Sequence, residues 1–300
     1  MASQPAAQQP PRPLVHLQNL EAADLPPHPN IRTPENHNVV LLDFLQRVLN
    51  DGVNFADTQI PRERSTTMAS PPSMVPVEVL KSEVTVQNGA RNGTTREKWV
   101  WRRSLHRNAQ HLGTATFEEF DANLRARHSV HELEWAPTVY DAHLVASWAE
   151  DIATTNGNVE KGVDLGGTYT DVTMDVYEMC HNPSALITNR AFPVVVITAK
   201  TDSEGFVVIQ IPVNLSVFPN GDVLYANGRN RREADTALRR KKTTPGMYVS
   251  VERVTVRGGE VQWVMATASD AKGNVPKFLQ KTAVPKAVVK DVGSFFAWLR

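Results

Sequence analysis

The stretch that decides the fold is GMYVSVERVTVRGGEVQWVMATASDAKGNVPKFLQKTAVPKAVVKDVGSFFAWLR, residues 246–300. Its first half holds two runs rich in β-branched and aromatic residues on either side of a Gly-Gly turn, which is typical of a β-hairpin. Its second half predicts one long amphipathic helix from about Val275 to Leu299. A strand pair that leads into a terminal helix indicates a curved sheet with the helix laid across it, and a cavity between the two.

The predicted terminal helix carries one apolar stripe at spacings of four, three and four residues: Val288, Val292, Phe295 and Leu299. We expect the first three of these side chains to face the sheet or a ligand. Lysines such as Lys286 and Lys290 fall on the opposite, solvated side. Pro285 has no N–H to donate, so we expect the helix to kink or break near Thr282.

A series of β-like runs precedes the hairpin, and turn residues separate most of them: 166–178, 191–200, 205–213 and 222–228. Strands in succession without helices between them indicate an antiparallel sheet. A charged stretch at 229–242 interrupts the series, and we interpret it as an exposed loop or a short helix.

The N-terminal half begins with a Pro- and Gln-rich tail and a connector, which together cover residues 1–37. The expected elements that follow are a helix at 39–49, a long loop at 51–75, a β-hairpin over 77–103, a helix at 117–127 capped by Thr116, and a second helix at 138–152.

This order resembles the START-like, or StAR-related lipid-transfer, superfamily, and more closely a fungal branch of unknown function. The resemblance rests on WVWRRSLH (99–106), AFPVVVITAKT (191–201), FVVIQIPVNLS (206–216), GMYVSVERV (246–254) and the segment from Trp263 through the final helix. It implies an α+β helix-grip fold, in which a curved antiparallel β-sheet wraps around a long C-terminal α-helix. It also implies that residues 38–300 form one ligand-binding domain with an apolar tunnel.

The resemblance implies binding of a lipid, a sterol or a polyketide-like molecule, and its transfer is the extension of that role. Residues that we expect to line the tunnel are Trp99, Trp101, Tyr177, Arg190, Tyr248, Glu252, Trp263, Val288, Val292 and Phe295. Each aromatic residue could equally belong to an ordinary core. Arg190 and Glu252 lie next to or inside β runs, where an inward charge must be paired or solvated; they could bind a ligand's polar head or pair with each other.

An enzyme on the same scaffold, such as a cyclase or hydrolase of polyketide-like substrates, is the second possible function. A regulatory interaction module is the third. We favour a binding protein, because no shared catalytic motif can be carried over and no catalytic residue, metal or cofactor is implied. Arg190, Glu252 and His181 are the candidates for acid–base chemistry if the chain is an enzyme.

Three local motifs suggest other chemistry. VDLGGTYTDV (163–172) resembles the phosphate-binding turn of actin-like ATPases, but a Gly-Gly bend that opens a strand explains it better, because too little chain follows for that fold. Cys180 and His181 are adjacent, so on a strand they point to opposite faces. His128, His131 and Glu132 could suggest a metal site, but only two of them share a helix face, and two ligands are too few.

The chain has no overall electrostatic field that would favour nucleic acid or an anionic membrane, because 32 Lys and Arg residues balance 32 Asp and Glu residues, but a local basic patch is still compatible with this balance. The basic stretch at 229–242 could dock on an anionic membrane surface, although a solvated loop is the simpler interpretation. It holds no aromatic residues, so we expect no nucleic-acid partner. Cys180 is the single cysteine, and no signal peptide or membrane-spanning run is visible, so we expect a cytoplasmic protein.

Overall fold

The computed structural model describes residues 13–32, 37–62, 65–88, 93–156, 165, 168–183, 188–201, 204–270 and 277–300. Its centre is a ten-stranded sheet. The strands are β1 (Thr66–Met68), β2 (Val77–Asn88), β3 (Gly93–Arg107), β4 (Val139–Ser147), β5 (Tyr169–His181), β6 (Asn189–Thr201), β7 (Gly205–Pro212), β8 (Thr243–Pro245), β9 (Met247–Arg257) and β10 (Glu260–Asp270). The helices are α1 (Leu41–Thr58), α2 (Phe117–Phe120), α3 (His128–Trp135), α4 (Ala149–Asn156), α5 (Asn230–Glu233) and α6 (Lys277–Leu299).

The sheet has the strand order β1-β2-β3-β10-β9-β7-β6-β5-β4, with antiparallel pairing along this path. The short β8 pairs in parallel with the start of β6. The predicted hairpin of β9 and β10 joins the two halves of the sheet, because β10 also pairs with β3 and β9 also pairs with β7. The expected antiparallel sheet with a C-terminal helix is therefore confirmed.

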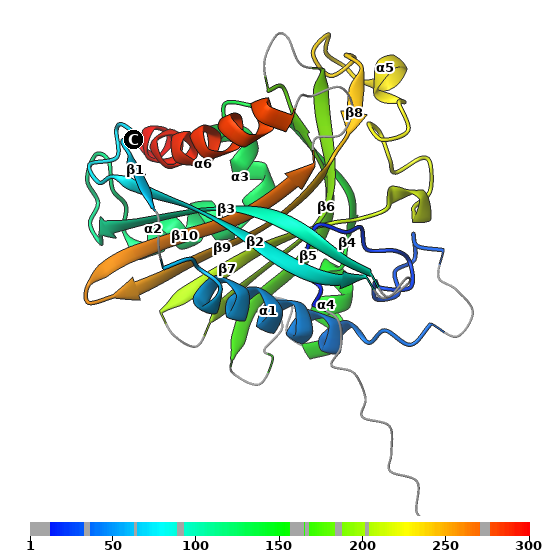
Figure 1. Cartoon of the computed structure of the whole chain (residues 1–300). Helices are drawn as coiled ribbons and strands as arrows, with labels where there is room; N and C mark the ends of the chain where they lie inside the picture. The colour runs from blue at the N-terminus through cyan, green and yellow to red at the C-terminus, as the bar shows by residue number, and fades with distance from the viewer. Residues whose placement is uncertain are drawn as a thin grey trace, which may run out of the picture.

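Helices cover both faces of the sheet, and Figure 1 shows α6 and α3 on one side and α1 on the other. Two apolar clusters fill these two interfaces. The first packs under α1 and includes Leu45, Trp99 and Val251, whereas the second packs under α6 and includes Trp263, Val292 and Phe295. Since side chains alternate along a strand, each of the longer strands, β2 to β7, β9 and β10, supplies residues to both clusters.

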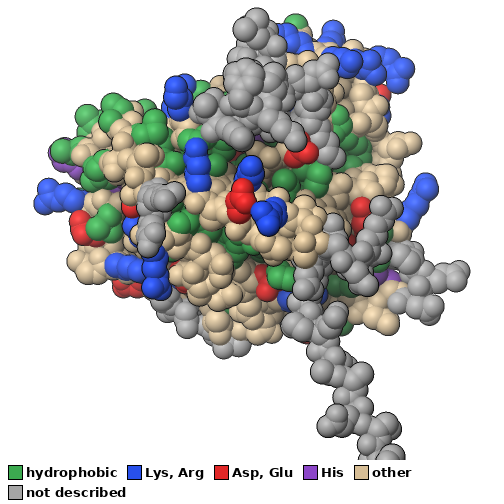
Figure 2. All heavy atoms as spheres, in the orientation of Figure 1, with side chains coloured by type: hydrophobic (Ala, Val, Ile, Leu, Met, Phe, Trp, Pro, Cys, Tyr) green, Lys and Arg blue, Asp and Glu red, His purple; other side chains and the backbone are tan. Residues whose placement is uncertain are grey.

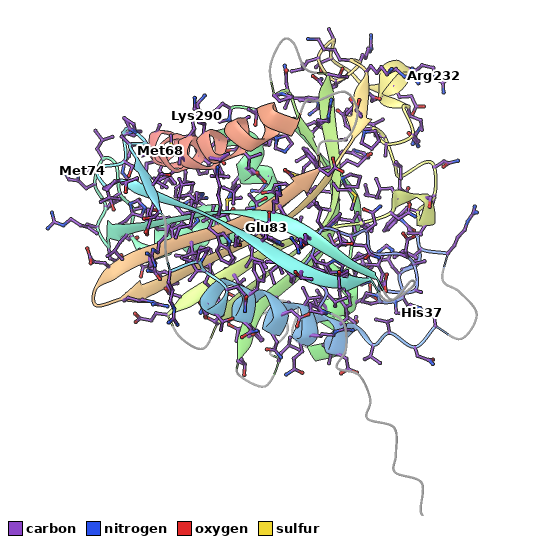
Figure 3. The ribbon with its side chains drawn as sticks, in the orientation of Figure 1. His37, Met68, Met74, Glu83, Arg232 and Lys290 are labelled. Atoms are coloured by element: carbon purple, nitrogen blue, oxygen red, sulfur yellow. The ribbon has the colours of Figure 1, made fainter. Side chains whose placement is uncertain are left out.

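Helix α6 is fixed to the segment before β2 by one serine. The Ser70 hydroxyl donates to the Val289 carbonyl oxygen at 2.6 Å and accepts from the Gly293 N–H at 2.8 Å. These two helix groups are the pair that an undisturbed helix would join to each other. The helix runs through Pro285 without the break expected near Thr282, and Figure 3 shows Lys290 on its outer side.

The prediction of a helix at 138–152 is wrong for Val139–Ser147, which form the edge strand β4. It is right only for the residues from Ala149 onward, which lie in α4. The β4–β5 pairing has register shifts between Val139 and Asp141 and between Leu144 and Ala146. Each such irregularity moves the buried positions out of strict alternation. The apolar spacing therefore resembles that of a helix.

Other boundaries also differ from the prediction. The predicted strand at 222–228 is a series of turns. Backbone N–H groups at 224–226 donate hydrogen bonds to the buried carboxylate of Glu178. The first helix extends to Thr58 instead of ending at Leu49. Thr116 and Glu119 form the expected N-terminal cap as a capping box, but the helix becomes a π-helical turn at Asp121–Arg125 and α3 follows it.

Candidate functional site

The face of the sheet under α6 gathers most of the residues predicted to line a tunnel. Trp263, Val292 and Phe295 belong to the apolar cluster there, and Tyr177 and Tyr248 pack against it. Val288 is buried on α6. Trp263 and Phe295 lie with their ring centroids 5.4 Å apart, and Phe120 of α2 packs against both rings.

Trp99 and Trp101 lie on the opposite face, under α1. Their ring centroids lie 4.5 and 5.1 Å from that of Phe55. Their indole nitrogens donate to Glu97 and Ser82 respectively. The structure thus separates these two tryptophans from the other predicted lining residues.

A buried ion pair is the main polar feature of the α6 face. Arg102 of β3 and Glu252 of β9 lie one strand apart, on either side of β10, with Arg102 Nη2 3.2 Å from Glu252 Oε2. The same carboxylate oxygen accepts a hydrogen bond of 2.7 Å from Trp263 Nε1. The Arg102 guanidinium also lies 3.9 Å above the Trp263 ring, which is a cation–π contact.

Arg102 still has donors to offer. The residue is 1% exposed, yet its Nε and Nη1 atoms have no hydrogen-bond partner among the described residues. Desolvation lowers the pKa of this guanidinium, while the nearby carboxylates of Glu252 and Asp291 act against the shift. A buried donor without an acceptor is costly, so an additional acceptor would stabilise this site.

Two carboxyl groups from the helices face the same region. Glu132 of α3 has a pKa raised to about 8, chiefly by desolvation and secondly by the charge of Glu252. Asp291 of α6 has a pKa raised to about 7 by desolvation, against the opposing charge of Arg102. Near neutral pH both groups therefore carry protons for much of the time, and they can donate as well as accept.

Sequence reasoning missed Arg102 and Asp291, and it considered Glu132 only as a metal ligand. A signal existed for Asp291, because it stands three residues after Val288 and so shares the apolar stripe of the helix. Arg102 alternates with Trp101 on a strand, which marks it for the face opposite that tryptophan. Nothing local indicated that Glu252 would be its partner.

Arg190 and His181 lie at the other end of the sheet face, where β5 ends and β6 begins. Arg190 is buried and donates through Nη1 to the backbone oxygens of Thr188 and Asn189. The two predicted charges do not pair with each other, since Glu252 takes Arg102. The ring of His181 packs edge-on against Phe192, and desolvation lowers its pKa to about 4.

The other local motifs, around Cys180 and His128, have structural roles in the part of the chain that the structure describes. Cys180 is a buried free thiol that contacts the Glu178 carbonyl oxygen, and desolvation raises its pKa. His128 and His131 bond backbone oxygens through Nδ1. Among the described residues, no group of three His, Cys, Asp or Glu side chains is placed to hold a metal ion. Asp164, Gly166 and Gly167 of the ATPase-like motif lie outside those residues.

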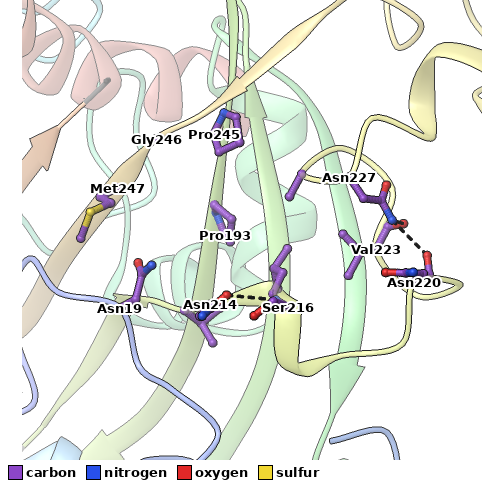
Figure 4. A pocket seen from close by; sticks show the side chains of 13 residues that line it. Asn19, Pro193, Asn214, Ser216, Asn220, Val223, Asn227, Pro245, Gly246 and Met247 are labelled. Atoms are coloured by element: carbon purple, nitrogen blue, oxygen red, sulfur yellow. Dashed lines mark hydrogen bonds between the residues drawn. The ribbon is translucent and has the colours of Figure 1, made fainter. Parts of the chain in front are cut away.

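A surface pocket of about 360 Å³ lies at the rim of the sheet, between the first part of β6, the end of β7 and the start of β9. Several asparagines surround it, and Figure 4 shows Asn214 bonded to Ser216 and Asn227 bonded to Asn220. These amides stabilise their own loops. The pocket shares no residue with the Arg102 site.

A family model described as "Protein of unknown function (DUF3074)" matches residues 99–299. Among solved structures, human StAR-related lipid transfer protein 5 aligns with a TM-score of 0.50 and 10% identity, over 86% of this chain and 97% of that chain. Human STARD10 aligns with a TM-score of 0.45 and 11% identity, over 82% and 78% of the two chains. No curated protein matches the chain. The likeness to StAR-related lipid transfer protein 5 shows that the fold is START-like.

None of the helices in the described part of the chain combines the length and apolar character needed to cross a bilayer.

Proposed function

Because the chain belongs to the DUF3074 family of proteins of unknown function and has a START-like fold, we propose that it binds a hydrophobic small molecule between the sheet and α6. The observation that carries this proposal is Arg102, a buried guanidinium with two nitrogens that lack a partner among the described residues. Aromatic and aliphatic side chains surround it, so a mainly apolar molecule with one polar group fits the site.

The charges of the site favour a polar group that both accepts and donates hydrogen bonds. Arg102 offers N–H donors, and the carboxyl groups of Glu132 and Asp291 offer acceptors. An anionic head would meet Glu252 next to Arg102, and an ammonium group could not accept from Arg102. An alcohol or amide at the end of an apolar body satisfies both sides, and lipids and sterols include such molecules.

The test begins with native mass spectrometry of the purified full-length chain, followed by organic extraction. We expect a copurified hydrophobic molecule, or binding of an added fluorescent long-chain alcohol. The matching long-chain carboxylate should bind more weakly. A chain that is empty and binds neither probe would overturn the proposal.

A matched variant locates the site. Arg102→Met combined with Glu252→Gln removes the ion pair without leaving a lone buried charge, and it should weaken binding of the alcohol. The control Trp99→Phe alters the opposite face of the sheet and should leave binding unchanged. Equal binding by wild type and both variants would place the ligand elsewhere.

An enzyme on this scaffold is the second candidate, and Glu132 and Asp291 favour it. Carboxyl groups with pKa values near neutrality suit general acid–base chemistry. In this candidate, Glu132 and Asp291 take the acid–base role that the sequence predicted for Arg190, Glu252 and His181. Conversion of a bound molecule by the wild type, lost in Glu132→Gln while binding persists, would support it.

A cytoplasmic location remains part of the proposal, and the buried free thiol of Cys180 agrees with a reducing compartment.

A further inference from the structure

We propose that an exposed basic surface beside α5 binds anionic lipid bilayers. We call it the basic platform, and its residues are Arg231, Arg232, Arg240, Lys241 and Lys242, all of which are exposed. Figure 2 shows Lys and Arg side chains gathered at the edge where Figure 1 places α5 and β8, and Figure 3 shows Arg232 there. The whole chain has no net charge, so this gathering is local.

The platform is held in place by a buried carboxylate. Glu178 of β5 is fully buried, and it accepts hydrogen bonds of 2.6–3.0 Å from the backbone N–H groups of Leu224, Tyr225 and Ala226. Charge-assisted bonds of this kind are among the stronger ones in proteins. The turn that leads into α5 is therefore fixed to the sheet.

A second buried carboxylate fixes the other side. Asp141 of β4 accepts from the Tyr225 hydroxyl and pairs with Arg239 at 2.9 Å. The buried amide of Asn230 donates to the backbone oxygens of Arg239 and Lys241. The platform is thus a fixed arrangement of charges, whereas a merely solvated loop would need no such anchors.

The acidic residues of the segment do not neutralise the platform. Glu233 pairs with Arg229, and Asp235 pairs with Arg239. The side chains of Arg232, Lys241 and Lys242 have no hydrogen bond or ion pair within the part of the chain that the structure describes. Their charges are available to an external anion.

The position of the platform favours a membrane over a nucleic acid. β8 follows the platform directly and pairs with the start of β6, and Figure 1 shows this end of the sheet beside the first turns of α6. Contact there would bring a bilayer to one end of the proposed binding site. No aromatic side chain stands between 229 and 242 to stack on a base.

The experiment is cosedimentation of the full-length chain with vesicles of phosphatidylcholine alone and of phosphatidylcholine with phosphatidylserine. We expect binding to the anionic vesicles only, and weaker binding at high salt. Each basic residue near an anionic surface adds roughly fivefold in affinity, so the triple variant R232Q/K241Q/K242Q should lose about 100-fold.

The matched control K81Q/R96Q/R257Q removes the same charge from exposed positions on β2, β3 and the far end of β9. It should keep most of the binding. Equal loss in both triple variants, or equal binding to neutral vesicles, would overturn the proposal, as would a triple variant that loses affinity for RNA but keeps it for vesicles. The triple variant should still hold the hydrophobic ligand, so the two proposals fail separately.

Discussion

The carboxylate of Glu252 lies 2.7 Å from the indole nitrogen of Trp263 and 3.2 Å from Arg102 Nη2, so one buried oxygen serves two donors from two strands. The residues come from β9, β10 and β3, which are neighbours in the sheet. The interaction therefore joins the C-terminal hairpin to the first half of the chain. It also leaves Nε and Nη1 of Arg102 without a partner among the described residues, on the face of the sheet that α6 covers.

Glu252→Gln should destabilise the protein by about 3–5 kcal/mol, because it leaves the buried Arg102 charge without its partner. Chemical denaturation measures this change. The control Glu83→Gln removes an exposed ion pair with Lys98 and should cost less than about 1 kcal/mol.

The double variant Arg102→Met with Glu252→Gln should recover most of the stability lost in the single variant, since no lone charge remains. A double variant as unstable as the sum of the single variants would show that the ion pair is not a unit.

Stability should fall as the pH rises from 6.5 to above 8. The folded state raises the pKa of Glu132 from 4.5 to about 8 and that of Asp291 from 3.8 to about 7. In this window the folded chain binds more protons than the unfolded chain, so deprotonation favours unfolding. His106 and His181 have lowered pKa values, about 3 and 4, against an ordinary value of 6.5. Their opposite effect partly offsets the fall near pH 6.5 and ends about one pH unit higher, where the unfolded imidazoles have lost their protons.

Denaturation curves across this pH range measure the effect, and Glu132→Gln should flatten it. The substitution also removes the Glu132 charge, which raises the pKa of Asp291 in the wild type. An unchanged slope in the variant would contradict the assignment of the effect to Glu132.

Gly293→Ala should destabilise the protein, although alanine normally favours a helix interior. A Cβ at this position would lie 2.3 Å from the Pro71 carbonyl oxygen and 2.8 Å from that of Ser70, both of which are backbone atoms. We expect a loss of about 1–3 kcal/mol in chemical denaturation, which is typical of overpacking. Gly221→Ala meets no atom within 4 Å and is the neutral control; a stabilised Gly293→Ala variant would argue against the close approach of α6.

Glu178→Gln should loosen the turn at 224–226 and with it the basic platform. The loss of a charged acceptor for three amides is expected to cost about 2–3 kcal/mol. Trypsin cleaves after Arg and Lys, so limited proteolysis within 229–242 should become faster in the variant. Glu204→Gln changes an exposed carboxylate and should match the wild type; equal proteolysis of all three chains would refute the anchoring role.

Local periodicity predicted much of the fold. The spacing of Val288, Val292 and Phe295 predicted one face of α6, and two of these side chains lie in the cluster beneath it. The alternation around the Gly-Gly turn predicted β9 and β10. The prediction failed at β4, where register shifts break the alternation that identifies a strand.

The sequence by itself determined most of the long strands, the final helix and which of its side chains share a face, because these properties depend on neighbours a few positions apart. Only the tertiary structure decided that Arg102 meets Glu252, 150 positions away, and that Glu178 meets the amides of 224–226. It also decided that Trp99 and Trp101 lie on the face away from α6. Those pairings depend on strand order and register, which bring distant residues together after each strand has formed.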